Sequence, residues 1–169
     1  NPPILATPTF WVYHMPTQRG IQLDEHDETS GASKYAAYYR AYVTTNDVRN
    51  DAIVRFCRNQ AKQGKTVAVL VTRVEHGERL LEMMPEARWV YGSHGEEARW
   101  AAFDGLRDGE FSILISTLLT EAIDLPFLDS VVYACAGDSK VAFPQSWRCM
   151  RSNIKDGTAT KPTCDIMTF

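Results

Sequence analysis

The nine residues QGKTVAVLV, from Gln63 to Val71, decide the architecture of this chain. Gly64, Lys65 and Thr66 match the end of a phosphate-binding P-loop, in which a strand precedes the glycine-rich turn and a helix follows it. Here the order is reversed, because a helical pattern precedes Gly64 and a β-branched run follows it. Asn59 also stands where the P-loop pattern requires its first glycine. The stretch therefore predicts a helix end and a buried strand, and no P-loop.

Short apolar strands and amphipathic helices alternate on both sides of this stretch. We expect strands at residues 10–15, 66–71, 88–91, 112–116, 130–134 and 163–169. We expect helices from Thr45 or Asn46 to Gln63, and at residues 74–84, 98–108 and 139–151. Strands that are apolar on both faces are typical of a parallel sheet covered by helices on both sides. The predicted fold class is α/β, with a parallel sheet of about six strands.

Composition describes an ordinary globular chain of 169 residues with 44% apolar residues, 23% charged residues and a net charge of -3. The negative charge argues against a broad basic surface, but leaves room for a local site of a few arginines and backbone amides. No apolar run is long enough for a membrane span, so we expect no membrane association. The four cysteines are far apart and form no zinc pattern, so we expect no metal site and a reduced, cytoplasmic protein.

The first 45 residues hold two patterns with alternative interpretations. The acidic run 24–27 imitates the magnesium-binding box of ATPases, but its polar surroundings favour a solvated loop. Four tyrosines follow one helix face, namely Tyr35, Tyr38, Tyr39 and Tyr42. They either stack on nucleic-acid bases or pack in the core, and an aromatic stripe at this spacing is more typical of core.

Ligands of a parallel sheet gather beyond the carboxyl ends of its strands. These ends carry Thr72 and Arg73, the turn that contains Ser93, and the segment STLLTEAIDLP that runs from Ser116 to Pro126. Arg148 and Arg151 follow, three residues apart and so on one helix face. From spacing alone, this pair either clamps a phosphate or pairs with surface acids.

From Thr66 to Phe169 the chain resembles the second, C-terminal RecA-like domain of superfamily 2 DNA helicases and translocases, in their phage or bacterial DEAD/DEAH-type branch. The resemblance rests on TVAVLVTRVEHGERL, on YGSHGEEARWAAFDGLRDGEFSILIST and on the pattern T-x-x-x-E-G-x-D-x-P. Thr117, Glu121, Asp124 and Pro126 match that last pattern. It implies residues 46–169 as the RecA-like domain and residues 1–45 as an entry strand, acidic loop and first helix, together one compact domain.

The resemblance implies a split ATPase that works on DNA, with RNA left open as the substrate. ATP and Mg²⁺ would be held mainly by an N-terminal RecA-like domain of the same protein. This chain would contribute the arginine fingers Arg148 and Arg151 and the nucleotide-binding residues Glu121, Asp124 and Gln145. Its nucleic-acid contacts would come from Thr72, Arg73, Ser93 and Thr117. By itself the chain would hydrolyse no ATP.

The sequence departs from the family pattern at three positions. Ala122 and Trp147 stand where the family has glycine, and Gln145 is one residue too close to the arginines. The alternatives are therefore a degenerate helicase-like module that binds nucleic acid or protein without hydrolysis, and an RNA helicase domain. We expect His76 to be a polar residue at a helix start and His94 to be a solvated turn residue. Arg99 either touches phosphate or lies along its helix with a buried stem.

Overall fold

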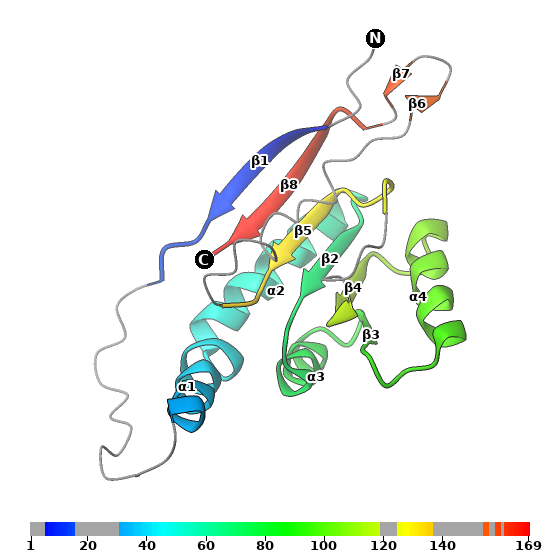
Figure 1. The fold of residues 1–169 in the computed structure, drawn as a ribbon. Helices are drawn as coiled ribbons and strands as arrows, with labels where there is room; N and C mark the ends of the chain where they lie inside the picture. Colours follow the sequence, from blue (N-terminus) through cyan, green and yellow to red (C-terminus); the bar gives the residue numbers. More distant parts are fainter. Residues whose placement is uncertain (1–5, 16–30, 119–124, 137–153, 156–157, 160) are drawn as a thin grey trace.

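The computed structural model describes residues 6–15, 31–118, 125–136, 154–155, 158–159 and 161–169. Six parallel strands form one sheet in the order β1-β8-β5-β2-β4-β3 (Figure 1). Their bounds are β1 Thr7–Val12, β2 Val67–Leu70, β3 Arg88–Val90, β4 Ile113–Ser116, β5 Ser130–Tyr133 and β8 Thr163–Thr168. A separate antiparallel pair joins β6 (Ile154–Lys155) to β7 (Thr158–Ala159). The predicted α/β class and parallel sheet are confirmed.

The central strands β2, β4 and β5 are buried along their whole length, as their continuous apolar sequences predict. The strand β2 pairs with β4 on one side and with β5 on the other, so that Leu70 lies opposite both Ser116 and Tyr133. The chain passes from β4 to β5 across β2, which makes β2 the point where the strand order reverses. In parallel sheets ligands bind at such a point, beyond the carboxyl ends of the strands.

Local chemistry sets the helix ends at the predicted positions. Helix α2 (Asp47–Lys62) begins after Asn46, whose side chain accepts a hydrogen bond from the amide of Arg49 at 3.1 Å. Gly64 follows its end with φ of 74°, and Gly109 follows α4 (Glu96–Asp108) with φ of 78°. Both glycines adopt the left-handed conformation that ends helices.

The residues after Gly64 confirm that this is no P-loop. Lys65 and Thr66 lie at the amino edge of the sheet, where they hold the chain together. Lys65 Nζ lies 2.6 Å from Asp165 Oδ2, and the amide of Thr66 donates to Asp129 Oδ2 at 2.9 Å. The lysine is therefore engaged in an ion pair at the edge opposite to the one where ligands of parallel sheets bind.

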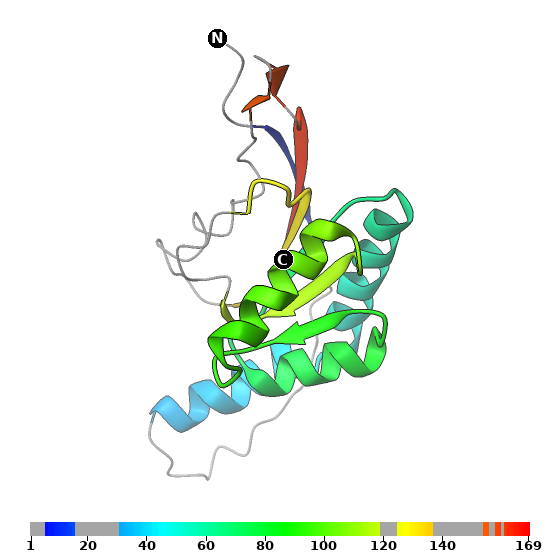
Figure 2. The ribbon, with the colours of Figure 1, turned by 90° about the vertical axis from the view of Figure 1, so that its right-hand side faces the viewer.

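Helices cover both faces of the sheet, with α2 and α3 (Val74–Met83) on one face and α4 on the other (Figure 2). The first face buries side chains of both helices, among them Ile53, Cys57 and Leu80, against β2, β4 and β5. The second face buries Phe103 and Leu106 of α4 against the opposite side of the same strands. Each face thus holds its own hydrophobic core. No described helix is long and apolar enough to cross a bilayer.

The N-terminal strand differs from its prediction, since β1 covers Thr7–Val12 and the expected strand covered residues 10–15. Its extent follows from its partner, because β1 pairs with β8 from Thr7 opposite Thr163 to Val12 opposite Thr168. The apolar run of β1 does not set its limits. Pairing with β8 makes this N-terminal strand part of the same sheet as the rest of the chain.

The prediction that the tyrosine stripe is core is wrong for two of its members. Helix α1 (Gly31–Tyr39) and the π-helix η1 (Arg40–Thr44) lie beyond the carboxyl ends of the strands and not on a face of the sheet (Figure 1). Tyr35 and Tyr38 are therefore 54% and 47% exposed, while Tyr39 is only 6% exposed. The acidic run 24–27 and the expected helix 139–151 lie outside the described residues.

Candidate functional site

Three loops meet at the carboxyl edge of the sheet next to the point where the strand order reverses. Leu70 at the end of β2 pairs with Ser116 at the end of β4, and Ser116 also pairs with Val90 at the end of β3. The loops that begin there carry Thr72 and Arg73, Thr117, and Ser93, the four residues predicted to contact nucleic acid. Their strands are adjacent, so the four lie on one edge.

The loop after β2 is tied to the end of α1. The hydroxyls of Tyr39 and Thr72 are 2.6 Å apart, and the guanidinium carbon of Arg73 lies 5.6 Å from the centre of the Tyr39 ring. Burial raises the pKa of Tyr39, so this phenol stays protonated at neutral pH. Thr72 and Arg73 themselves are exposed. They stand on a loop whose position Tyr39 fixes, with their side chains open to a ligand.

A buried arginine that the sequence analysis missed holds the end of β5. Arg49 is 6% exposed, and one of its terminal amines donates to the carbonyls of Ala134 at 3.1 Å and Cys135 at 3.0 Å. Its guanidinium carbon lies 3.8 Å from the centre of the Phe169 ring. Burial lowers the pKa of Arg49 to about 10. The signal that could have found it is its spacing, four residues before Ile53 on the buried face of α2.

The described residues place no carboxylate in a salt bridge with Arg49. Within the described part of the chain its charge faces two carbonyl dipoles and one aromatic ring, and its Nε has no hydrogen-bond partner. Burying a cation in this way costs free energy, so the residue is a poor choice for stability alone. It orients the chain that leaves β5 at the carboxyl edge.

A network of buried polar side chains lies beside Arg49. One of them is His76, which lies in the first turn of α3, as predicted, but is completely buried, which the sequence did not indicate. Asn50 donates to the carbonyl of Thr44 at 2.9 Å, so its amide oxygen is free to accept from His76 Nε2, 2.9 Å away. Helix α3 packs its first turn against α2, and this buries the ring. This network of hydrogen bonds joins η1, α2 and α3.

The loop after β4 begins with an ordered turn. Ser116 is fully buried and its hydroxyl accepts from the amide of Leu118 at 3.0 Å, while Thr117 between them is half-buried. The predicted nucleotide-binding residues Glu121 and Asp124 follow at once, outside the described residues. Gln145 and the predicted catalytic pair Arg148 and Arg151 also lie outside them. Their roles stay predictions.

The turn after β3 carries Ser93, which is exposed, and His94, which is half-buried. His94 lies in a ladder of rings, 4.3 Å from Tyr91, which is stacked 5.2 Å from Trp89. The ring nitrogen Nδ1 of His94 accepts from the amide of Tyr91 at 3.3 Å. His94 therefore shapes the turn that presents Ser93, and it is more than the solvated turn residue expected.

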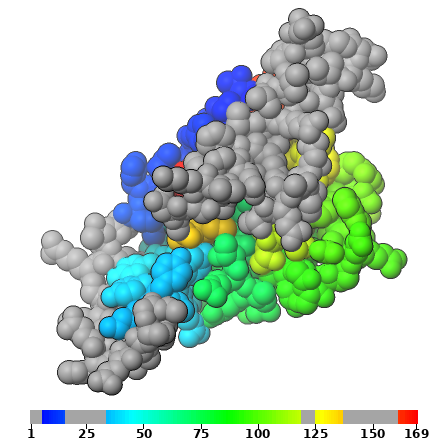
Figure 3. Space-filling model, in the orientation of Figure 1, coloured from blue at the N-terminus to red at the C-terminus, as the bar shows by residue number. Residues whose placement is uncertain are grey.

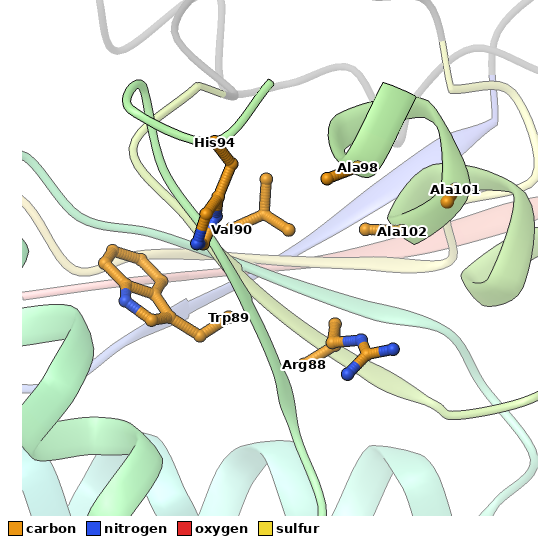
Figure 4. Close-up of a pocket in the computed structure, with 7 residues that line it drawn as sticks. All are labelled: Arg88, Trp89, Val90, His94, Ala98, Ala101 and Ala102. Atoms are coloured by element: carbon orange, nitrogen blue, oxygen red, sulfur yellow. The ribbon is translucent and has the colours of Figure 1, made fainter. Parts of the chain in front are cut away.

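A hollow of about 360 Å³ lies beside β3, on the α4 side of the sheet. It is lined by Arg88, Trp89, Val90, His94, Ala98, Ala101 and Ala102. Figure 4 shows the alanines of α4 on one side of the hollow and the residues of β3 on the other. Of the residues that line the hollow only Arg88 and His94 are ionisable, so it offers few groups for binding or catalysis. Arg99 of the same helix is half-buried, as expected for an arginine that lies along its helix.

The described residues contain no group of three or more histidines, cysteines or carboxylates placed to hold a metal ion. The three cysteines that the structure describes are buried free thiols, and burial raises the pKa of Cys135 to about 12. None of them is an activated nucleophile. The described loops at the carboxyl edge carry the hydroxyls of Thr72, Ser93 and Thr117 and the guanidinium of Arg73.

Comparison with solved structures finds the same architecture in several of them. T4 UvsW matches with a TM-score of 0.58 at 15% identity, over 96% of this chain and 31% of that one. The RecA-like fold of the chain is confirmed. Domain 2 of the DEAD-box helicase Mss116p, bound to an RNA duplex, matches with a TM-score of 0.54 at 15% identity, over 70% of this chain and 48% of that one.

A third solved structure, S. cerevisiae Dbp5 bound to RNA and ADP BeF3, matches with a TM-score of 0.54 at 14% identity, over 71% of this chain and 32% of that one. The RecA-like chain spans about a third to a half of the length of these three structures. No family model and no curated protein matches its sequence. The likeness is therefore one of fold.

Proposed function

We propose that this chain is the C-terminal RecA-like half of an ATP-dependent DNA helicase or translocase. The observation that carries the proposal is the fold likeness to T4 UvsW over 96% of the chain. The proposed partner is an N-terminal RecA-like domain of the same protein, which would hold ATP and Mg²⁺. Because the stretch at Gly64 is not a P-loop, this chain would not hold the nucleotide alone. The nucleotide would bind in the cleft between this chain and the N-terminal domain.

In this proposal Arg148 and Arg151 stabilise the charge that develops on the transferred phosphoryl group. Glu121, Asp124 and Gln145 line the nucleotide side of the cleft. Support comes from the spacing of the arginines and from the motif that follows β4. Their place in the chain also fits, because both arginines come after β5, whose end Arg49 holds at the carboxyl edge.

The nucleic-acid contacts would be Thr72, Arg73, Ser93 and Thr117, which the strand register brings to one edge. Hydroxyls and one arginine suit contacts to the phosphate backbone, which carry no sequence information. Binding should therefore be independent of base sequence and weaken steeply with salt. DNA is the proposed substrate, and stimulation by RNA in its place would assign the chain to the RNA helicases.

The test is ATP hydrolysis by the two-domain protein in the presence of DNA. Arg148→Ala and Arg151→Ala should each lower the turnover rate about a thousandfold, as for other arginines that meet transition-state charge, with nucleotide affinity little changed. Arg58→Ala is the matched control, because Arg58 is an exposed arginine that pairs with Glu86 on the surface. It should leave turnover unchanged.

The second candidate is a helicase-like module without hydrolysis, which is favoured by Trp147 in the place of the family glycine. Near-normal turnover in both arginine variants would refute the assigned roles. No nucleic-acid-stimulated turnover in the intact two-domain protein would favour this second candidate. Turnover by the 169-residue chain alone, in a preparation free of contaminating ATPases, would refute the split site altogether.

A further inference from the structure

The proposed function leaves the exposed tyrosines of α1, and the half-buried Tyr42 of η1, without a role. Tyr35 is 54% exposed and Tyr38 is 47% exposed. The rings of Tyr38 and Tyr42 are stacked, with centres 6.0 Å apart and planes 19° from parallel. Tyr35 and Tyr39 are also 6.0 Å apart. The stripe is thus ordered by ring contacts while much of its area stays open to solvent.

The backbone of this segment departs from α-helical geometry between Arg40 and Thr45. The amide of Thr45 donates to the carbonyl of Arg40 at 2.8 Å, five residues earlier, which is the hydrogen bond of a π-helix. Such turns are rare and occur often at functional sites. Tyr42 lies within this wider turn and Tyr38 just before it, so that the stacked pair spans the change from α-helix to π-helix.

The stripe adjoins the proposed phosphate contacts. Its buried member Tyr39 bonds to Thr72 at 2.6 Å and lies under Arg73. Both views show α1 at the edge of the molecule (Figures 1 and 2), and in the space-filling view it forms the light-blue surface at the lower left (Figure 3). A strand of nucleic acid held at Thr72 and Arg73 would reach the tyrosines next.

The chemistry of the stripe fits a polyanion with flat bases. Between Gly31 and Thr44 the sequence has two cations, Lys34 and Arg40, and no carboxylate. Arg40 forms an exposed ion pair with Glu75 of α3 at 2.9 Å, which a phosphate would have to displace. The exposed residues of α1 that the structure describes are lysine, alanine and tyrosine, without the aliphatic side chains that a docked protein helix requires. Exposed aromatic rings beside cations are the feature with which proteins bind single strands.

We infer that Tyr35, Tyr38 and Tyr42 form a stacking platform for the bases of single-stranded nucleic acid whose phosphates lie against Thr72 and Arg73. This inference rests on the proposed function and adds a base contact to it. The platform takes bases of any kind, because stacking uses the ring face that every base has. It would hold the strand at the entrance to the carboxyl edge.

The test measures how tightly the purified 169-residue chain binds a fluorescent oligothymidylate of about 20 nucleotides, by anisotropy at low salt. Tyr35→Ala and Tyr38→Ala should each weaken binding about tenfold, as expected for the loss of one stacked base. Tyr35→Phe and Tyr38→Phe keep the ring and should bind as the wild type does. Circular dichroism of each variant shows whether the fold is kept.

Trp100→Ala is the matched control, since Trp100 is 52% exposed on α4, which covers the face of the sheet opposite α2 and α3. It should bind the oligonucleotide as tightly as the wild type. An abasic oligonucleotide of the same length loses every stacked base, so it should bind the wild type at least as weakly as oligothymidylate binds either alanine variant.

Equal affinity of the wild type for the abasic and the normal strand would overturn the platform, and so would unchanged affinity in folded alanine variants. The second result is also expected if the tyrosines contact the N-terminal domain instead. In both cases the chain still binds nucleic acid, so the proposed function stands. Failure of the proposed function is recognised separately, by the absence of nucleic-acid-stimulated ATP turnover in the intact two-domain protein.

Discussion

Mild acid should destabilise this chain through one buried histidine. His76 is completely buried, and its neutral Nε2–H donates to Asn50 Oδ1. Its other ring nitrogen, Nδ1, has no hydrogen-bond partner. A proton added there would place an unpaired charge in the interior, near the positive side chains of Arg49 and Arg79. Burial, and then these two charges, lower the pKa of His76 to about 4.

The sign follows from the two states of the chain. In the unfolded chain His76 takes up its proton near the ordinary pKa of about 6.5, while the folded chain resists it down to about pH 4. Between these values the unfolded state binds more protons, so stability falls as the pH falls. From about pH 7 to pH 5 the free energy of unfolding should decrease by about 2 kcal/mol from this group alone.

The assay is urea denaturation of the wild type and of His76→Gln at the two pH values. Glutamine can still donate to Asn50 Oδ1 but takes up no proton, so the variant should lose about 2 kcal/mol less than the wild type between them. Comparison of the two losses cancels the contribution of the carboxylates. An equal loss of stability in both proteins would show that His76 is protonated in the folded state, and would refute the argument.

Two further predictions concern the packing of α3 against β3 and the position of the chain after β5. Gly77→Ala should destabilise the chain by about 1–3 kcal/mol in urea denaturation, because an added Cβ would lie 2.2 Å from the Trp89 ring. Gly92→Ala is the control and should leave the stability unchanged, because an added Cβ there would meet nothing within 4 Å. Equal losses of stability in the two variants would refute the packing argument. Arg49→Met should leave two buried carbonyls unpaired and speed hydrogen exchange after β5. Unchanged exchange there would contradict the positioning role of Arg49.

Much of the fold could be predicted because its signals are local. The cap at Asn46 and the left-handed glycines Gly64 and Gly109 need only their own neighbours in the chain. The strand at Val67–Leu70 is buried on both sides, so its sequence is apolar throughout and its type is clear. The order of helix, turn and strand around Gly64 was enough to reject the P-loop.

The errors occur where tertiary position decides. Periodicity showed that the tyrosines share a helix face, but it does not show whether a helix lies on the sheet or beyond its edge. Tyr35 and Tyr38 are exposed because their helix lies beyond the edge of the sheet. His76 is buried because the first turn of α3 meets Asn50 of α2, a contact between residues 26 positions apart. No local pattern marks such a contact.

The same distinction between local and tertiary signals applies to the candidate site. The roles of Thr72, Ser93 and Thr117 stay predictions. The sequence did place them on one edge, because in a parallel sheet all loops after the strands begin on one side, and these residues follow adjacent strands. It missed what holds that edge. Arg49 bears its charge among carbonyls and a ring, with a pKa lowered by burial to about 10. At the opposite edge Lys65 is neutralised by Asp165. A chain selected for stability alone would pair both cations. Among the described residues no carboxylate pairs with Arg49, and it lies at the carboxyl edge where we propose that ligands bind, so the cost of its buried charge is consistent with that function.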